Sequence, residues 1–308
     1  MTPIPVRLRR RPTFAWVGVV PFFLFAIAAL GLPVGYLVIG SFQGPGGTLT
    51  FKNFADLSTG TIPRAFLNSI EISLVTAVVG GIFGFLLAWA VIMGGLPGWI
   101  RSAVMTFSGV ASNFAGVPLA LAFVFTIGNL GLITKAFLEA PPYVCETFRL
   151  ADACKDWAIS LRRDLGFTIY SKAGLEIVYL YFQFPLMVLI IAPALDGLRR
   201  EWREASENLG ASAFQYWRRV ALPILAPSIL GTMILLFGNA FGAQATAFQL
   251  TGGTIEIVTI AIGRQIRGDV LHNPGLGYAM AMGMVVIMGF SITVYTLLQR
   301  RSERWLRS

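Results

Sequence analysis

Several common kinds of catalytic machinery are missing from this sequence of 308 residues. It has no GxxxxGK[ST] phosphate-binding loop, so we expect that the chain does not hydrolyse ATP by itself. It also has no HExxH, CxxC or GxSxG motif, and the single histidine, His272, precedes an Asn-Pro turn. These absences argue against an enzyme and a metal site, and predict a chain without a cofactor of its own.

Charged residues are also scarce, at 13% of the chain, whereas 56% of the residues are hydrophobic. A mean hydropathy of +0.71 lies far from the balance of a soluble globular domain. Runs long enough to cross about 30 Å of hydrocarbon occur at about 14–40, 67–92, 99–128, 174–196, 226–250 and 276–299. The sequence therefore predicts an all-α, polytopic membrane protein with six transmembrane helices.

The distribution of charge provides a test of this topology. The segments expected on one face contain fourteen of the 24 basic residues and five of the 15 acidic residues, so the whole formal charge of +9 lies there. Because basic residues accumulate on the cytoplasmic side of membrane proteins, this face and both termini are expected in the cytoplasm. The arginines flank spans and do not form one patch with interleaved aromatics, which argues against nucleic-acid binding.

The first apolar run predicts a retained helix because it continues to Gly40 without a cleavage site for a signal peptidase. We expect one transmembrane domain over 1–308. It comprises an N-terminal arm and first span at about 1–40, core spans at about 67–299 and a cytoplasmic loop at about 197–223.

Both cysteines, Cys145 and Cys154, fall in the long segment expected outside the membrane, at about 129–173. An oxidising exterior and a nine-residue separation would permit a disulfide between them. Two free thiols are the alternative.

Polar residues inside the spans are candidates for a solute path because unpaired polar groups are costly in hydrocarbon. Arg64, Asn68 and Glu71 share a helix face at the outer end of the second span. Glu71 either lines the path or forms an interfacial ion pair with Arg64. The residues deeper in the spans either contact solute or make hydrogen bonds between helices; they are Asn113, Gln183, Asn239 and Gln244. The candidate path residues are Asn68, Glu71, Asn113, Gln183, Asn239 and Gln244.

A polar insertion separates the fourth and fifth spans. Residues 199–209 contain strong helix formers and end at Gly210, the residue type that most readily closes a helix in a left-handed conformation. Ser212 and Gln215 then have the spacing of a capping box that starts a second helix. We expect Pro223 to stop this second helix before the fifth span, and Trp217, Arg218 and Arg219 to project from it.

This insertion resembles the signature loop of permease subunits of type I binding-protein-dependent ABC importers. Their pattern is EAA, three residues, Gly, nine residues and I-x-L-P, which matches residues 204–206, Gly210 and 220–223. Ser206 and Val220 depart mildly from it. The first span, with Pro33 and a Ser41-Phe42 ending, and the start of the second span, 66–69, are similar to the spermidine/putrescine permease branch. The expected ATPase-coupling residues are Glu204, Ala205, Ser206, Gly210, Ser212, Trp217, Arg218, Leu222 and Pro223.

The resemblance implies a bacterial inner-membrane subunit that forms half of a pore. Its expected partners are a dimer of ATPase subunits that bind ATP, a second permease that is identical or paralogous, an external solute-binding protein and the lipid bilayer. It suggests a polyamine as the solute, with a phosphonate or another small anion as the alternative. An ion-driven secondary transporter is the rival class, although neither inverted repeats nor charged residues near the midplane support it. A scaffold subunit without a conduit is a third alternative.

Overall fold

The computed structural model describes residues 18–44, 47–134, 166–267 and 272–307. Within these ranges the chain is helical, and its strand-like pairing is limited to one bridge between Gln43 and Leu49. The elements are α1 (Val20–Ala26), η2 (Ile27–Gly31), α2 (Leu32–Ser41), α3 (Lys52–Asp56), α4 (Ile62–Met93), α5 (Gly98–Asn113), α6 (Val117–Ile127), α9 (Lys172–Asp196), α10 (Arg200–Asn208), α11 (Ala213–Tyr216), η4 (Trp217–Ala221), α12 (Leu222–Gly242), α13 (Gln244–Thr251), α14 (Val258–Arg267) and α15 (Pro274–Arg307). The predicted all-α class is confirmed.

Five continuous helices of the described chain are long and apolar enough to cross a membrane. They are Val20–Ser41, Ile62–Met93, Lys172–Asp196, Ala213–Gly242 and Pro274–Arg300. The sixth candidate span is a pair of helices, α5 and α6, which are bent by 106° at a short break. Six candidate spans result when this pair is taken as one, which agrees with the predicted count.

Two predicted spans had wrong outlines. The third, expected as one run at 99–128, breaks between Asn113 and Val117, where Gly116 has a φ of +77° that favours glycine. The fifth, expected to end near 250, ends at Gly242, and α13 then starts in a new direction. Hydropathy could not show either break because the apolar composition continues through both.

The bundle is built around the contact between α4 and α9, the most extensive between any two elements of the described chain. Glycines on α4 permit this close approach, as expected for helices that pack in a membrane. A Cβ added at Gly84 would lie 2.7 Å from the Met187 Cβ and 2.9 Å from the Phe184 carbonyl oxygen. A Cβ at Gly80 would lie 2.8 Å from the Gln183 Cβ. The two backbones therefore approach more closely than a side chain at Gly80 or Gly84 would permit.

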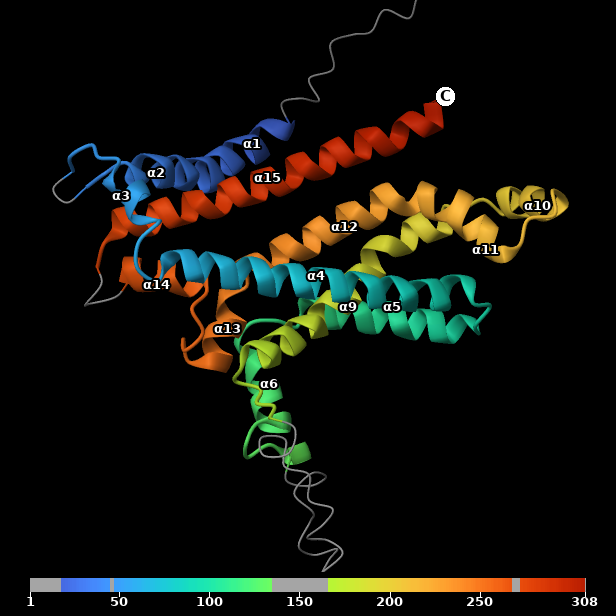
Figure 1. The fold of residues 1–308 in the computed structure, drawn as a ribbon, viewed down its shortest axis with the longest axis horizontal. Helices are drawn as coiled ribbons and strands as arrows, with labels where there is room; N and C mark the ends of the chain where they lie inside the picture. Colours follow the sequence, from blue (N-terminus) through green and yellow to red (C-terminus); the bar gives the residue numbers. More distant parts are fainter. Residues whose placement is uncertain (1–17, 45–46, 135–165, 268–271, 308) are drawn as a thin grey trace, which may run out of the picture.

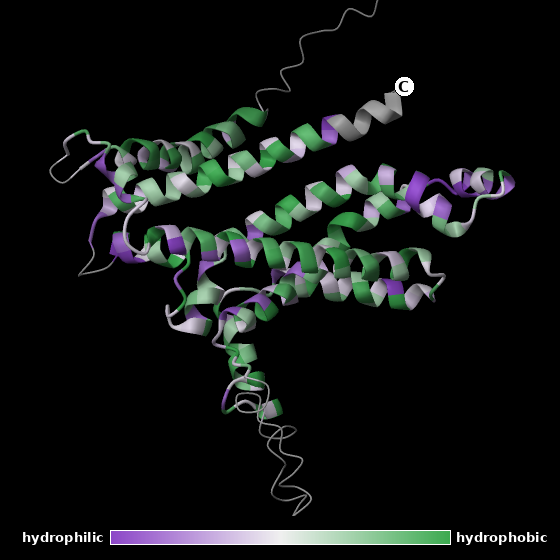
Figure 2. Ribbon diagram, in the orientation of Figure 1, coloured by the Kyte–Doolittle hydropathy of each residue, from purple (hydrophilic) through white to green (hydrophobic). Residues whose placement is uncertain are grey.

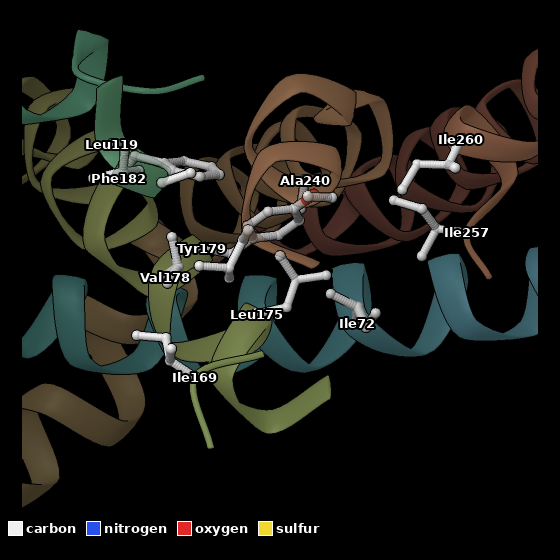
Figure 3. Close-up of a cluster of buried hydrophobic side chains, with 13 residues drawn as sticks. Ile72, Leu119, Ile169, Leu175, Val178, Tyr179, Phe182, Ala240, Ile257 and Ile260 are labelled. Carbon is white, nitrogen blue, oxygen red and sulfur yellow. The ribbon is translucent and has the colours of Figure 1, made fainter. Parts of the chain in front are cut away.

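Side chains of α9 continue this core toward α4, α12 and α14 (Figure 3). Tyr179 is 1% exposed and its hydroxyl donates a hydrogen bond to the carbonyl of Ala243, at the break between α12 and α13. Leu175 and Ile72 pack beside it from α9 and α4. The break after α12 is therefore anchored to the centre of the bundle.

The long helices run between two ends of different character (Figures 1 and 2). α10, α11, the start of α5 and the C-terminal end of α15 lie toward one end, and α3 and α14 lie toward the other. Hydrophilic residues gather at both ends, and the helices between them are mostly hydrophobic. This arrangement suits a protein that crosses a bilayer along the long helices.

Candidate functional site

The first arm of the polar insertion is α10, which ends in a glycine turn. The Gly210 amide donates to the Glu207 carbonyl at 2.9 Å, and the Ala211 amide donates to the Ser206 carbonyl at 3.0 Å. This pair of bonds is a Schellman motif, and it requires the positive φ of +76° that Gly210 adopts. The predicted glycine closure of this helix is confirmed.

The second arm begins at Ser212 with a complete capping box. The Gln215 amide donates to the Ser212 hydroxyl at 3.3 Å, and the Ser212 amide donates to the Gln215 side-chain oxygen at 2.8 Å. Backbone groups at the end of one helix and the start of the next are thus satisfied locally. The angle between α10 and α11 is therefore set by hydrogen bonds within a few residues of Gly210.

The second arm does not stop at Pro223, which corrects the prediction from the sequence. α11 continues through the π-helical turn η4 into α12, and together they form one helix from Ala213 to Gly242. A proline normally breaks the helix ladder because it has no amide proton. Here Pro223 lies in the first turn after η4, where the wider turn already interrupts the regular bonding. We refer to α10, α11, η4 and the turn between them, residues 200–221, as the elbow.

The outer surface of the elbow carries apolar side chains and paired charges. Leu209 is 87% exposed and Phe214 is 72% exposed, one on each side of the glycine turn. Glu204 accepts a hydrogen bond from Arg200 at 2.9 Å, and Glu207 accepts one from Arg203 at the same distance. Sequence reasoning missed Leu209 and Phe214, although an apolar residue on each side of Gly210 in a polar segment was a usable signal.

The remaining predicted coupling residues take different positions. Ser206 donates its hydroxyl to the Trp202 carbonyl at 2.8 Å, which orients it along α10. Ala205, Arg218, Leu222 and Pro223 are exposed. Trp217 does not project outward as the sequence suggested, because its ring meets that of Trp89 on α4, with the centroids 5.7 Å apart. Trp217 therefore joins the elbow to the bundle and does not belong to its outer surface.

At the opposite end, α4 is held to the loop before α14. Asn68 donates to the Glu256 carbonyl at 2.9 Å, and the Ser69 hydroxyl accepts from the Val258 amide at 2.8 Å. Glu256 also forms a two-point ion pair with Arg264, with both contacts at 2.9 Å. This pair was missed in the sequence, where its members lie in a loop and a short helix without a recognisable motif.

Glu71 forms an ion pair, but with Lys172 of α9 and not with Arg64 as the sequence suggested. Arg64 shares the α4 face, but the close packing of α4 against α9 brings Lys172 to Glu71. Glu71 remains 60% exposed in its side chain, and Glu176 lies one turn beyond Lys172 on α9. Two carboxylates therefore lie beside one lysine at this end of the bundle.

Gln183 is the most deeply buried of the predicted path residues. It is fully buried and donates to the Leu236 carbonyl of α12 at 2.9 Å. Its side-chain oxygen has no hydrogen-bond partner among the described residues. Gln183 thus connects α9 to α12 by a hydrogen bond, while its Cβ lies opposite Gly80 of α4. A hydrogen bond between helices was one of the two roles expected for this residue.

Asn113 and Gln244 lie at the two helix breaks, which meet in space. Asn113 donates to the Gly109 carbonyl at 2.9 Å at the end of α5, and Gln244 starts α13. The Gly116 amide donates to the Thr246 hydroxyl of α13 at 2.8 Å, so α6 and α13 are joined at their N-terminal ends. Asn239 is exposed on α12. The six predicted path residues thus lie on several helices, and their role in a solute path stays a prediction.

Cys145 and Cys154 lie outside the described residues, so their pairing stays a prediction. Among the described residues there is no group of three or more His, Cys, Asp or Glu side chains that could hold a metal ion.

Comparisons with known proteins show which family the chain belongs to. Residues 12–308 match the family described as "Binding-protein-dependent transport system inner membrane component". The chain is 24% identical to the spermidine/putrescine transport system permease protein PotB of Haemophilus influenzae over 94% of each chain. It is 25% identical to a probable sulfate transport system permease protein, cysT, of Nephroselmis olivacea over 74% of this chain and 70% of the relative.

The fold also resembles that of a solved transporter chain. A chain of a bacterial ABC transporter involved in the import of the acidic polysaccharide alginate superimposes with a TM-score of 0.64. The match covers 93% of this chain and 95% of that one, at 15% identity. The protein therefore belongs to the inner-membrane permease family of binding-protein-dependent ABC importers.

Proposed function

We propose that the chain forms half of a solute pathway and couples it to a separate ATPase subunit through the elbow. The observation that carries this proposal is the shape of the elbow, a pair of short helices fixed by a Schellman motif and a capping box. A surface fixed in this way can transmit a push because little motion is lost in bending. ATP would be bound by the partner, since the chain has no phosphate-binding loop.

The exposed apolar side chains support a docking role for the elbow. Leu209 and Phe214 lie beside the turn, where a partner groove would bury them, and apolar burial is worth about 25 cal/mol per Å². Glu204 and Glu207 form ion pairs with Arg200 and Arg203, so both signs of charge are present on α10, directly before Leu209. The proposal also places the elbow and the C-terminal end of α15 in the cytoplasm, which is the side that the predicted charge distribution indicates.

The test is co-purification of the ATPase subunit with the permease from membranes. Leu209→Asp and Phe214→Asp should each reduce recovery of the ATPase subunit, because a carboxylate would have to enter an apolar groove. Leu49→Asp is the matched control, since Leu49 is 84% exposed at the opposite end of the molecule. Undiminished recovery with both elbow variants would contradict docking through this surface.

For the solute we propose a polyamine, with sulfate, phosphonate or another small anion as the alternative. The relative that spans 94% of both chains is named for spermidine and putrescine. Glu71 and Glu176 also lie on either side of the single Lys172, which places two carboxylates beside one cation in this part of the outer end. Sulfate permeases are similarly related, so the cognate external binding protein should be titrated with putrescine, sulfate and a phosphonate. Binding of an anion and not of putrescine would overturn the polyamine assignment.

The second permease, identical or paralogous, and the external binding protein remain expected partners. An ion-driven secondary transporter is the alternative class. Proteoliposomes that contain this chain alone and still accumulate solute against its gradient would favour that alternative.

A further inference from the structure

The elbow meets the transmembrane bundle at a pair of tryptophans. Trp89 lies near the end of α4, and Trp217 opens the π-helical turn of the elbow. Their rings are edge to face, with the centroids 5.7 Å apart and an interplanar angle of 85°. Tyr216, which is 4% exposed, lies beside Trp217 with its ring centroid 6.1 Å away. The second arm of the elbow therefore meets α4 through the rings of Trp217 and Trp89, with the Tyr216 ring next to Trp217.

A cavity of about 210 Å³ lies next to this contact. Its walls include Trp89 and Met93 of α4, Arg203 and Glu207 of α10, and Tyr216 of α11. This cavity opens to the surface, since Arg203, Glu207 and Ser212 in its wall are exposed. The cavity separates part of α10 from the end of α4, so at this level the ring contact of Trp89 with Trp217 links the elbow to α4.

Two mechanical routes lead from the elbow into the bundle. The first is the continuous helix from α11 through η4 into α12. The second is the contact of Trp217 with α4, which packs against α9 over a surface with no side chain at Gly80 or Gly84. Because α4 and α9 form the most extensive contact in the described chain, a push on α4 would move the centre of the bundle as one body.

We propose that Trp89 and Trp217 are positioning residues that transmit movement of the elbow to α4 and α9. This inference rests on the proposed coupling of the elbow to an ATPase, and it adds a specific route that the signature loop does not contain. Trp89 lies more than a hundred residues before that loop in the sequence. The contact would act after the ATPase has docked, so its loss should uncouple the two activities without releasing the subunit.

The experiment uses the complete importer in proteoliposomes. Its cognate binding protein is purified with the solute that it carries. The measurement is the stimulation of ATP hydrolysis by this binding protein, together with recovery of the ATPase subunit. Trp89→Ala and Trp217→Ala should each lower the stimulation about fivefold, which corresponds to about 1 kcal/mol, the usual worth of an aromatic pair. In Trp89→Ala, whose residue lies on α4 and outside the elbow, basal hydrolysis and recovery of the ATPase subunit should remain unchanged.

The double variant should be no worse than either single variant, since both singles remove the same contact. Trp89→Phe should retain most of the stimulation because it keeps an aromatic edge against Trp217. The matched control is Trp99→Ala, which removes a 72% exposed tryptophan at the start of α5, at the same end of the molecule.

Normal stimulation in Trp89→Ala would overturn the inference. A double variant whose loss of stimulation is the product of the two single losses would overturn it too. The same holds if Trp89→Phe loses as much stimulation as Trp89→Ala. Loss of the ATPase subunit in Trp217→Ala alone would place that residue in docking and likewise contradict the route. Failure of the proposed function is distinguishable, because it appears as normal ATPase recovery in Leu209→Asp and Phe214→Asp.

Discussion

The contact between α4 and α9 and the elbow obtain definite shapes in opposite ways. The helices α4 and α9 are distant in sequence and meet along a surface where glycine allows the backbones to approach. The elbow is local, and its turn is fixed by hydrogen bonds between residues no more than five positions apart. The first region depends on packing and the second on backbone conformation. Substitutions should therefore damage them through different mechanisms.

The largest effect is expected at the packed surface. Gly84→Leu should lower the free energy of unfolding by about 3 kcal/mol, because overpacking a tight core forces backbone shifts. The added side chain would meet the Met187 Cβ and the Phe184 carbonyl. Thermal unfolding in detergent measures the change. Gly109→Leu is the control, since a Cβ at Gly109 meets nothing within 4 Å. Equal stability of Gly84→Leu and Gly109→Leu would show that the contact between α4 and α9 does not depend on glycine at position 84.

A smaller loss of stability but a complete loss of transport is expected at the glycine turn. Gly210→Val should cost about 2 kcal/mol locally, since a β-branched residue with positive φ is strongly disfavoured. Uptake should fall to background while membrane insertion and the unfolding of the bundle stay normal. Gly210→Asn should keep most of the uptake because asparagine tolerates this conformation. Full uptake by the valine variant would show that the turn need not be rigid.

The smallest effect is expected at the helix cap. Ser212→Ala removes the acceptor of the Gln215 amide and should destabilise the second arm by about 1 kcal/mol. Hydrogen exchange should accelerate at residues 213–216 and remain unchanged in α4. Ser206→Ala serves as the comparison, because the Ser206 hydroxyl bonds within α10 and caps no helix. Unchanged exchange in the capped segment would mean that contacts with α4 hold this arm.

The sequence was sufficient where local rules apply. The end of α10 at Gly210 and the capping box at Ser212 follow from residue type and spacing, and both were predicted. The number of candidate membrane spans was predicted because hydropathy is decisive over some twenty residues. The orientation of the charge across the membrane remains a prediction.

Features that depend on tertiary contacts were predicted less well. Glu71 pairs with Lys172, a residue one hundred and one positions away, because α4 packs on α9 and not because of helix spacing. The breaks at Gly116 and Ala243 occur within apolar sequence, where composition gives no signal. Trp217 faces inward because its ring contacts Trp89 of α4. The sequence around Trp217 does not show that α4 lies there.

The π-helical turn at Trp217–Ala221 also sets the rotation of one helix segment relative to the other. An ordinary α-helix advances about 100° per residue, so one additional residue in a turn rotates everything that follows by that angle. The turn thus allows Trp217 to face α4 while Leu225 and Leu236 of the same continuous helix remain buried in the bundle. Without this phase shift, a straight helix would direct one of these two faces toward lipid or water.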